Sequence, residues 1–138
     1  MTIVKKYLFL GVLIFANASA TWALAPETQQ NQDVFVPLAK YIANGDAEAL
    51  SAWFATSLEI DILGRTNISS KQQAKQILKD FFSENTPKSF SFSYSSGKVP
   101  MKYAVGTLNA SSNKFRVTIF VRTTSEGNYI ENIRIEKE

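Results

Sequence analysis

The strongest constraint on the fold is the alternation of apolar and polar residues in the C-terminal part of the chain. Phe90, Phe92 and Tyr94 are separated by single serines. A period of two places successive side chains on opposite faces of a β-strand, so this segment predicts a strand with one apolar face. Similar patterns between Gly, Pro, Asn and Ser turn residues predict further strands at residues 102–108, 115–121 and 129–135. Four consecutive strands with short connections favour an antiparallel sheet.

The last of these strands contains a break in its pattern. Ile130 has the opposite parity to Ile133 and Ile135. A β-bulge near Glu131-Asn132 brings all three isoleucines to one face, and bulges also bend strands. We therefore predict a curved sheet.

The segment before the sheet indicates helices. Residues 34–42 repeat apolar side chains at helical spacing after Asp33, a candidate N-cap. Asn44-Gly45-Asp46 is expected to end this helix and to cap a second one over residues 47–54.

A short hairpin and a longer helix follow. Residues 57–63 alternate and predict a strand, residues 64–67 predict a turn, and Ile68 is expected to start a short partner strand. Ser70 and Gln73 have the spacing of a capping box. The helix that they open carries one apolar stripe: Ala74, Ile77, Leu78, Phe81 and Phe82.

The N-terminus has the pattern of a secretory signal. Lys5 and Lys6 precede an uncharged run at residues 7–15, and Ala18 and Ala20 form the A-x-A pattern of a cleavage site. We prefer cleavage after Ala20 to cleavage after Ala23-Leu24-Ala25, because that site places Pro26 beside the scissile bond. The run is shorter than the roughly 20 residues that span a bilayer. The protein is therefore expected to be exported, periplasmic or extracellular, with no membrane span after cleavage.

These features predict three segments. Residues 1–20 form the signal peptide, residues 21–32 a disordered lead-in, and residues 33–138 a single domain. Without the leader's two lysines, the 15 basic residues become 13 against 12 acidic ones, and the net charge falls from +3 to +1. The basic stripe of a nucleic-acid-binding protein is missing.

Composition excludes several chemistries. The chain contains no cysteine and no histidine, which excludes a thiolate nucleophile, a Ser-His-Asp triad and an ordinary zinc site. The acidic residues are scattered, so neither a metal nor a cofactor is expected. Stability must come from packing rather than from disulfides.

The chain resembles a known superfamily in three stretches: Ile77-Leu78-Lys79-Asp80-Phe81-Phe82, Lys102-Tyr103-Ala104-Val105-Gly106-Thr107-Leu108 and Ile133-Arg134-Ile135-Glu136-Lys137-Glu138. It is similar to the nuclear transport factor 2-like superfamily and, more narrowly, to small secreted bacterial domains of unknown function within it. The resemblance implies an α+β cone, in which a strongly curved antiparallel sheet carries three helices on its concave face.

The same resemblance implies a pocket between sheet and helices, but it does not choose a function. Enzymes of the superfamily pair an Asp or Glu base with a Tyr donor, and its dehydratases use a His-Asp pair that this chain cannot form. Glu59 and Asp61 lie on the polar side of their predicted strand, and Asp80 lies off the apolar stripe of its helix. We therefore assign no catalytic residue.

Four aromatic residues are candidates for lining the pocket: Tyr41, Trp53, Tyr94 and Tyr103. Each combines a large apolar body with a polar tip, which suits either a small apolar ligand or a packed core. Both interpretations stay open at this point.

A second candidate surface lies on the opposite face of the sheet. Arg116 and Arg122 alternate with apolar residues and are expected to point outward, and Phe120 shares their parity. An outward phenylalanine among arginines predicts a partner or a homodimer through the open sheet face.

The sequence thus predicts an exported, non-catalytic binding or interaction module, which takes a small apolar ligand or docks to an envelope protein. One alternative is a small isomerase or dehydratase that uses a buried carboxylate and a tyrosine. A second is a structural or dimerising envelope protein.

Overall fold

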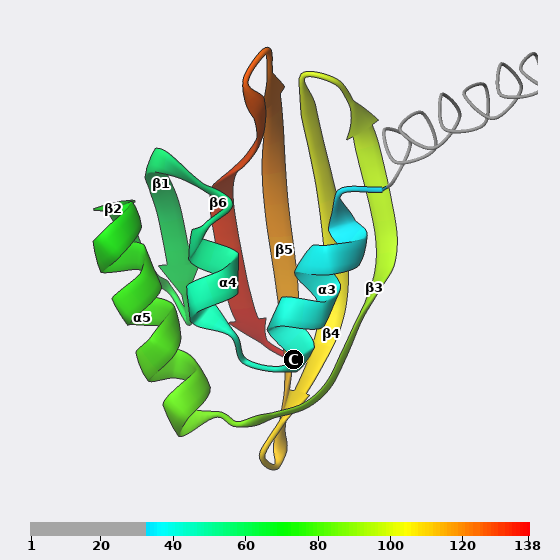
Figure 1. The fold of residues 1–138 in the computed structure, drawn as a ribbon. Coiled ribbons are helices and arrows are strands. Elements are labelled where there is room, and N and C mark those ends of the chain that lie inside the picture. The colour runs from blue at the N-terminus through cyan, green and yellow to red at the C-terminus, as the bar shows by residue number, and fades with distance from the viewer. Residues whose placement is uncertain (1–32) are drawn as a thin grey trace, which may run out of the picture. The chain divides into compact units, whose positions relative to one another are not determined.

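The structure, a computed structural model, describes residues 33–138. In this part of the chain three helices lie against one face of a six-stranded sheet with the strand order β2-β1-β6-β5-β4-β3 (Figure 1). Neighbouring strands are antiparallel except β1 and β6, which are parallel. The predicted signal peptide and lead-in lie outside the described residues. The elements in chain order are α3 (Phe35–Ala43), α4 (Ala47–Ser51), β1 (Phe54–Ile62), β2 (Arg65–Ser70), α5 (Lys71–Glu84), β3 (Pro87–Lys98), β4 (Met101–Ala110), β5 (Asn113–Thr124) and β6 (Gly127–Lys137).

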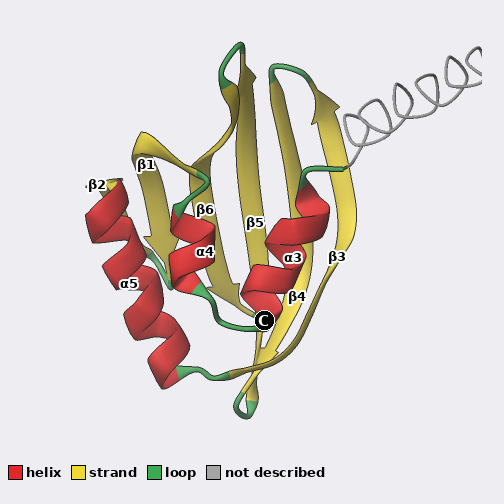
Figure 2. Cartoon of the chain, viewed as in Figure 1, coloured by secondary structure: helices red, strands yellow, loops and turns green. Residues whose placement is uncertain are grey.

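The sheet curves around the helices, as predicted (Figure 2). In the β5–β6 ladder Phe120 pairs with Asn132, and the residue after Phe120 pairs with Ile130. Glu131 is therefore the extra residue of a β-bulge. All three isoleucines of β6 are then buried on the concave face. The bulge predicted near Glu131-Asn132 is confirmed.

The core fills the space between the helices and the sheet. Leu38 of α3, Leu50 of α4 and Leu78 of α5 are each at most 1% exposed. Where these helices meet β5 and β6, only about 10 Å³ remains unfilled. A site needs about that volume to hold one water molecule. The unfilled space is lined entirely by apolar side chains: Ile42, Leu50, Leu78, Phe82, Val117, Ile119, Ile133 and Ile135.

The first two helices are joined by a tight turn, as predicted. Gly45 adopts φ +64°, a conformation that favours glycine. The Asp46 side chain accepts a hydrogen bond from the Ala49 N–H at 3.0 Å and so caps α4. The start of α3 differs by one residue, because Val34 rather than Asp33 occupies the N-cap position.

The second helix is shorter than predicted. It ends at Ser51, and Phe54, expected at its C-terminus, is the first residue of β1. The Ile130 N–H donates to the Trp53 carbonyl at 2.7 Å, and Phe54 pairs with Ile130 in the β1–β6 ladder. Pairing with β6 thus overrides the helical propensity of this segment.

The hairpin between β1 and β2 is tighter than predicted. Leu63 and Gly64 both have positive φ, which is the pattern of a two-residue type I′ turn. Arg65 then pairs directly with Ile62, so β2 begins at Arg65 instead of Ile68. Of the predicted turn at residues 64–67, only Gly64 is in the turn, and residues 65–67 belong to β2.

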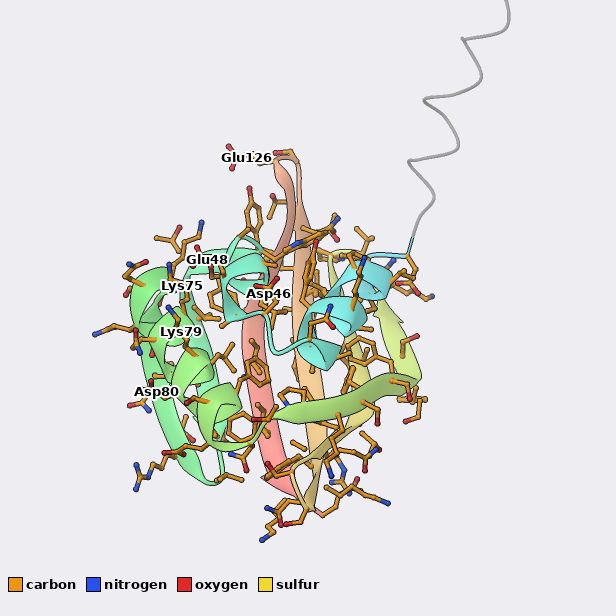
Figure 3. The ribbon with its side chains drawn as sticks, turned by 60° about the horizontal axis from the view of Figure 1, so that its bottom comes forward. Asp46, Glu48, Lys75, Lys79, Asp80 and Glu126 are labelled. Carbon is orange, nitrogen blue, oxygen red and sulfur yellow. The ribbon has the colours of Figure 1, made fainter. Side chains whose placement is uncertain are left out.

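The long helix begins as the sequence predicts. The Ser70 side chain accepts from the Gln73 N–H at 3.2 Å, and the Gln73 side chain accepts from the Ser70 N–H at 3.1 Å. One turn further on, Lys75 forms an ion pair with Glu48 of α4 at 3.3 Å (Figure 3). The capping box is confirmed, and the ion pair links α5 to α4.

We predict that Ser70→Ala lowers the free energy of unfolding by about 1 kcal/mol, because the Gln73 N–H loses its acceptor. Urea denaturation followed by circular dichroism measures the change. Ser83→Ala, at an exposed position of the same helix, is the control and should change stability by less than about 0.5 kcal/mol. Equal effects of the two substitutions would contradict a capping role.

Candidate functional site

Among residues 33–138, side chains closely fill the space where α3, α4 and α5 meet β5 and β6. Tyr41 and Trp53 are half-buried and pack against the hydrophobic core. The void at this place, of about 10 Å³, is far below the 300–1,000 Å³ of typical ligand pockets. Of the two interpretations of these aromatic residues, packing in the core agrees with their contacts.

Tyr94 lies on the face of the sheet that points away from the helices. A second bulge explains its position: Phe92 pairs with Gly106 and Tyr94 pairs with Val105, so Ser93 is an extra residue. The bulge reverses the alternation after Phe92. The sequence pattern placed Tyr94 on the same face as Phe92, and the structure differs at this point.

Three aromatic side chains form a cluster on this outer face. The Tyr103 ring stacks on Phe120 with centroids 5.3 Å apart, and it lies 6.0 Å from the Tyr94 ring. The Tyr103 hydroxyl donates to the Tyr94 hydroxyl at 3.4 Å. Tyr94 is 55% exposed. We call these three residues the outer aromatic cluster, and its two tyrosines therefore line no cavity between sheet and helices.

A shallow hollow of about 380 Å³ adjoins this cluster. Asn132 lies in it, and its Nδ2 donates to Glu59 Oε1. The other atom of the amide, Asn132 Oδ1, is buried and has no hydrogen-bond partner among the described residues. A buried acceptor without a partner is uncommon and calls for an explanation. The hollow is lined by Glu59, Met101, Phe120, Glu131, Asn132 and Arg134.

The arginines of the outer face are paired with carboxylates. Arg116 lies 3.9 Å from Glu136 and 3.8 Å from Glu138. Arg122 donates to Glu131, and this hydrogen bond raises the pKa of Arg122. The surface around Phe120 is therefore a mixed-charge surface rather than a basic stripe. These pairs have no local signal in the sequence, because the carboxylates come from the adjacent strand β6 or from Glu138 just after it.

The isomerase alternative needs a buried carboxylate, and no Asp or Glu of residues 33–138 is fully buried. Ser69 is the single buried polar or charged residue within residues 33–138. Glu59 and Asp61 lie on the outer face, where Asp61 is 3.6 Å from Arg134. This part of the chain also has no group of three potential ligands that could hold a metal ion.

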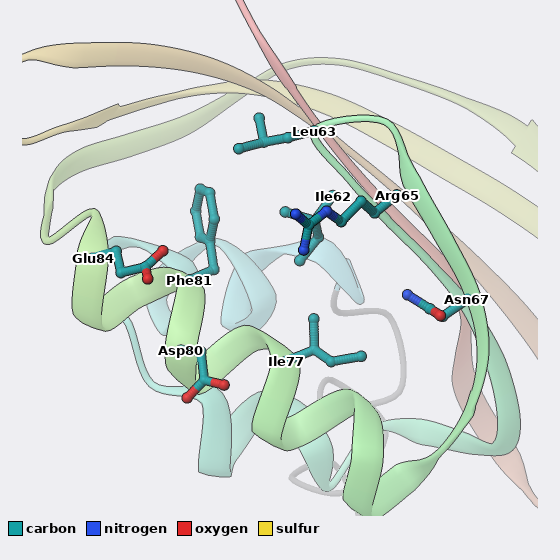
Figure 4. Close-up of a pocket in the computed structure, with 8 residues that line it drawn as sticks. All are labelled: Ile62, Leu63, Arg65, Asn67, Ile77, Asp80, Phe81 and Glu84. Carbon is teal, nitrogen blue, oxygen red and sulfur yellow. The ribbon is translucent and has the colours of Figure 1, made fainter.

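A second hollow, of about 630 Å³, lies between the β1–β2 hairpin and α5 (Figure 4). Arg65 extends from the hairpin toward α5, whose Ile77 and Phe81 lie across from it. Sequence reasoning missed this cleft, because residues 64–67 predict a turn and Asp80 lies off the apolar stripe of its helix. We call it the hairpin cleft. Its lining residues are Ile62, Leu63, Arg65, Asn67, Ile77, Asp80, Phe81 and Glu84.

Comparison with known families shows which family the chain belongs to. Residues 35–136 match a family described as Domain of unknown function (DUF4783). The chain belongs to this family. No curated protein matches the sequence.

Solved structures agree with this assignment. A DUF4783 protein from Bacteroides ovatus has 23% identity and a TM-score of 0.74, covering 78% of this chain and 98% of its own. A DUF4783 protein from Bacteroides fragilis has 26% identity and a TM-score of 0.72, covering 77% of this chain and 100% of its own.

More distant solved structures share the overall fold. An NTF-2 like protein of unknown function from Silicibacter pomeroyi has 14% identity and a TM-score of 0.55, covering 90% of this chain and 98% of its own. The predicted α+β fold of the nuclear transport factor 2-like superfamily is confirmed. Within residues 33–138, no helix of this DUF4783 domain has the length and apolar character to cross a membrane.

We predict that Tyr103→Phe raises the pKa of Tyr94. The hydrogen bond from Tyr103 stabilises the Tyr94 phenolate and lowers its pKa, while the same bond raises the pKa of Tyr103. An ultraviolet pH titration, assigned by NMR, measures the change. Tyr129→Phe, which removes a hydroxyl elsewhere on the sheet, should leave the Tyr94 titration unchanged; an unchanged titration in Tyr103→Phe would show that the bond is not formed in solution.

Proposed function

We propose that this protein is an exported, non-catalytic interaction module that binds a partner protein through the outer face of its sheet. The observation that carries the proposal is the hollow beside Phe120, with its unpartnered Asn132 Oδ1. A partner whose binding turns this amide toward the hollow can supply the N–H or O–H donor that the buried acceptor lacks.

The physical argument begins with the cost of the unpartnered acceptor. A buried polar atom without a hydrogen bond destabilises a fold by about 1–3 kcal/mol. Asn132 keeps its position because its Nδ2 donates to Glu59, which leaves Oδ1 unpaired. A donor from a partner pairs this oxygen in the complex only. The free energy that the unpaired oxygen costs the free protein is therefore regained on binding and strengthens the affinity.

The outer aromatic cluster supplies the apolar contact area. Tyrosine and phenylalanine are enriched at protein interfaces, where large rings lose little conformational entropy on binding. The ion pairs of Arg122 with Glu131 and of Arg134 with Asp61 lie beside the hollow. Such a charged rim around an aromatic centre favours a protein partner over a small apolar ligand.

Export rests on the sequence of the leader. Lys5 and Lys6, the uncharged run at residues 7–15 and the A-x-A pattern ending at Ala20 support a cleaved signal. The partner is then a protein of the cell envelope or of the extracellular space.

A homodimer through the same face is the second candidate. The outer face carries both signs of charge, with Arg116 and Arg134 near Glu136 and Asp61. A two-fold axis through such a surface can place the arginines of one copy opposite the carboxylates of the other. The two candidates use the same residues and differ in the mass of the complex.

We predict that a photo-cross-linking amino acid at position 120 captures a partner, whereas the same group at Val99, an exposed turn position, captures none. The full chain is expressed in a bacterium with its own leader, cells are fractionated, and cross-linked products are weighed by mass spectrometry. A product at twice the protein's mass identifies the homodimer, and any other discrete mass identifies a heterologous partner. Retention in the cytoplasm would refute export, and equal products at both positions would refute the outer-face site.

We further predict that Asn132→Leu weakens partner binding without lowering the stability of the fold. The substitution removes the unpartnered oxygen, so the free energy of unfolding should stay within about 1 kcal/mol of the wild type or rise. Affinity for the captured partner should fall at least tenfold. Thr118→Val, on the same face, is the control and should retain binding; a large loss of stability in Asn132→Leu would mean that the asparagine serves the fold.

A further inference from the structure

We propose that the free edge of β2, together with the hairpin cleft, binds an extended peptide segment of a partner chain by strand addition. The segment carries a carboxylate that pairs with Arg65 and an apolar side chain that enters the cleft. This site is separate from the outer face and does not depend on the function proposed above.

The first support is the position of β2 in the sheet. β2 is an edge strand that pairs with β1 on one side and with no other strand of residues 33–138 on the other. An edge strand presents unpaired N–H and C=O groups, which can pair with another chain.

The register identifies which backbone groups are free. In a two-residue hairpin the residues flanking the turn, here Ile62 and Arg65, exchange both backbone hydrogen bonds, and bonding pairs then alternate. Leu63, one residue beyond Ile62, donates its N–H to Ile135 of β6, in agreement with this alternation. Thr66 and Ile68 therefore direct their N–H and C=O groups toward the free edge.

The second support is an exposed apolar side chain on this edge. Ile68 is 70% exposed and lies on the outer side of β2. A β-branched residue beside unpaired backbone groups is the usual composition of a strand inside a sheet, whereas free edges commonly carry charged residues or proline. Ile68 thus suits a position between two strands.

The third support is the chemistry of the hairpin cleft. On the concave side of β2, Arg65 has no ion-pair partner among the described residues, and it extends over the cleft (Figure 4). Ile77 and Phe81 form an apolar wall across from it. An added strand points alternate side chains to this side, at positions i and i+2 about 7 Å apart. One of them reaches Arg65, and the other lies against Ile77.

The acidic residues of α5 fix where the carboxylate binds. Asp80 accepts from Gln76 at 2.9 Å, and Glu84 lies one turn further along the helix. Both line the cleft on its helical side. Asp80 and Glu84 repel a carboxylate of the bound segment on the helical side of the cleft. That carboxylate therefore has a favourable electrostatic interaction only beside Arg65.

The test uses a short fluorescent peptide of β-branched residues with one Glu and, two residues further on, one Leu. Binding to the exported protein is followed by fluorescence anisotropy, and amide hydrogen exchange is followed by NMR. We expect slower exchange of the Thr66 and Ile68 amides on binding. Arg65→Glu should weaken binding at least tenfold, and a peptide with Lys in place of its Glu should restore it.

Three controls define the result. Arg116→Glu reverses a charge on the outer face and should leave peptide binding unchanged, as should Phe120→Lys. A peptide with N-methylated backbone amides should not bind. Equal binding by Arg65→Glu, or binding without protection of the two amides, would overturn the proposal. A dimer whose Thr66 and Ile68 amides are protected without peptide would assign this edge to a second copy and overturn it as well.

Discussion

The bulge at Glu131 holds Ile130 on the same face as Ile133, and the helices pack against that face. Without the extra residue, Ile130 points to the outer surface, since a shift of one position reverses every side chain of a strand. Each fully buried isoleucine contributes about 1.5–3 kcal/mol relative to an exposed one. The same bulge bends β6, so one local irregularity supports both the apolar face and its curvature. The protein has no cysteine to compensate for a weaker core.

The interior beneath α4 and α5 is closely packed with apolar side chains. The superfamily fold allows a cavity between sheet and helices, but here Leu50, Leu78 and Phe82 occupy that space. The two larger hollows lie on the outer face and beside the hairpin, and both contain polar atoms that the described residues leave unpaired. A closely packed core also supports these surfaces, because interiors of crystal-like density have low compressibility.

Sequence reasoning recovered the parts of the fold that depend on local pattern. The four C-terminal strands, the capping box at Ser70 and the parity break at Ile130 each have a signal within a few residues, and each is confirmed. The fold class and the family resemblance are confirmed as well. The predicted end of α4 was wrong, because the hydrogen bond from the Ile130 N–H to the Trp53 carbonyl joins residues far apart in the sequence.

The candidate site was less accessible to sequence reasoning. Tyr94 changes face because of a bulge at Ser93, and nothing in the alternating Phe-Ser pattern marks that residue as extra. The pairing of Arg122 with Glu131 and the unpaired oxygen of Asn132 arise from cross-strand neighbours. The hairpin cleft depends on a two-residue turn at Leu63-Gly64, whose Leu has a conformation unusual for its residue type.

The two-sided strands have a consequence for how such domains diverge. Along β5, inward residues such as Val117 and Ile119 determine stability, whereas outward residues such as Thr118 and Phe120 meet solvent. Substitutions at exposed positions usually change stability by less than about 0.5 kcal/mol. Selection can therefore rewrite the outward half of each strand while the inward half keeps the backbone in place. Solved DUF4783 structures with 22–26% identity and TM-scores of 0.72–0.74 agree with such a division, because the backbone is kept while most side chains differ.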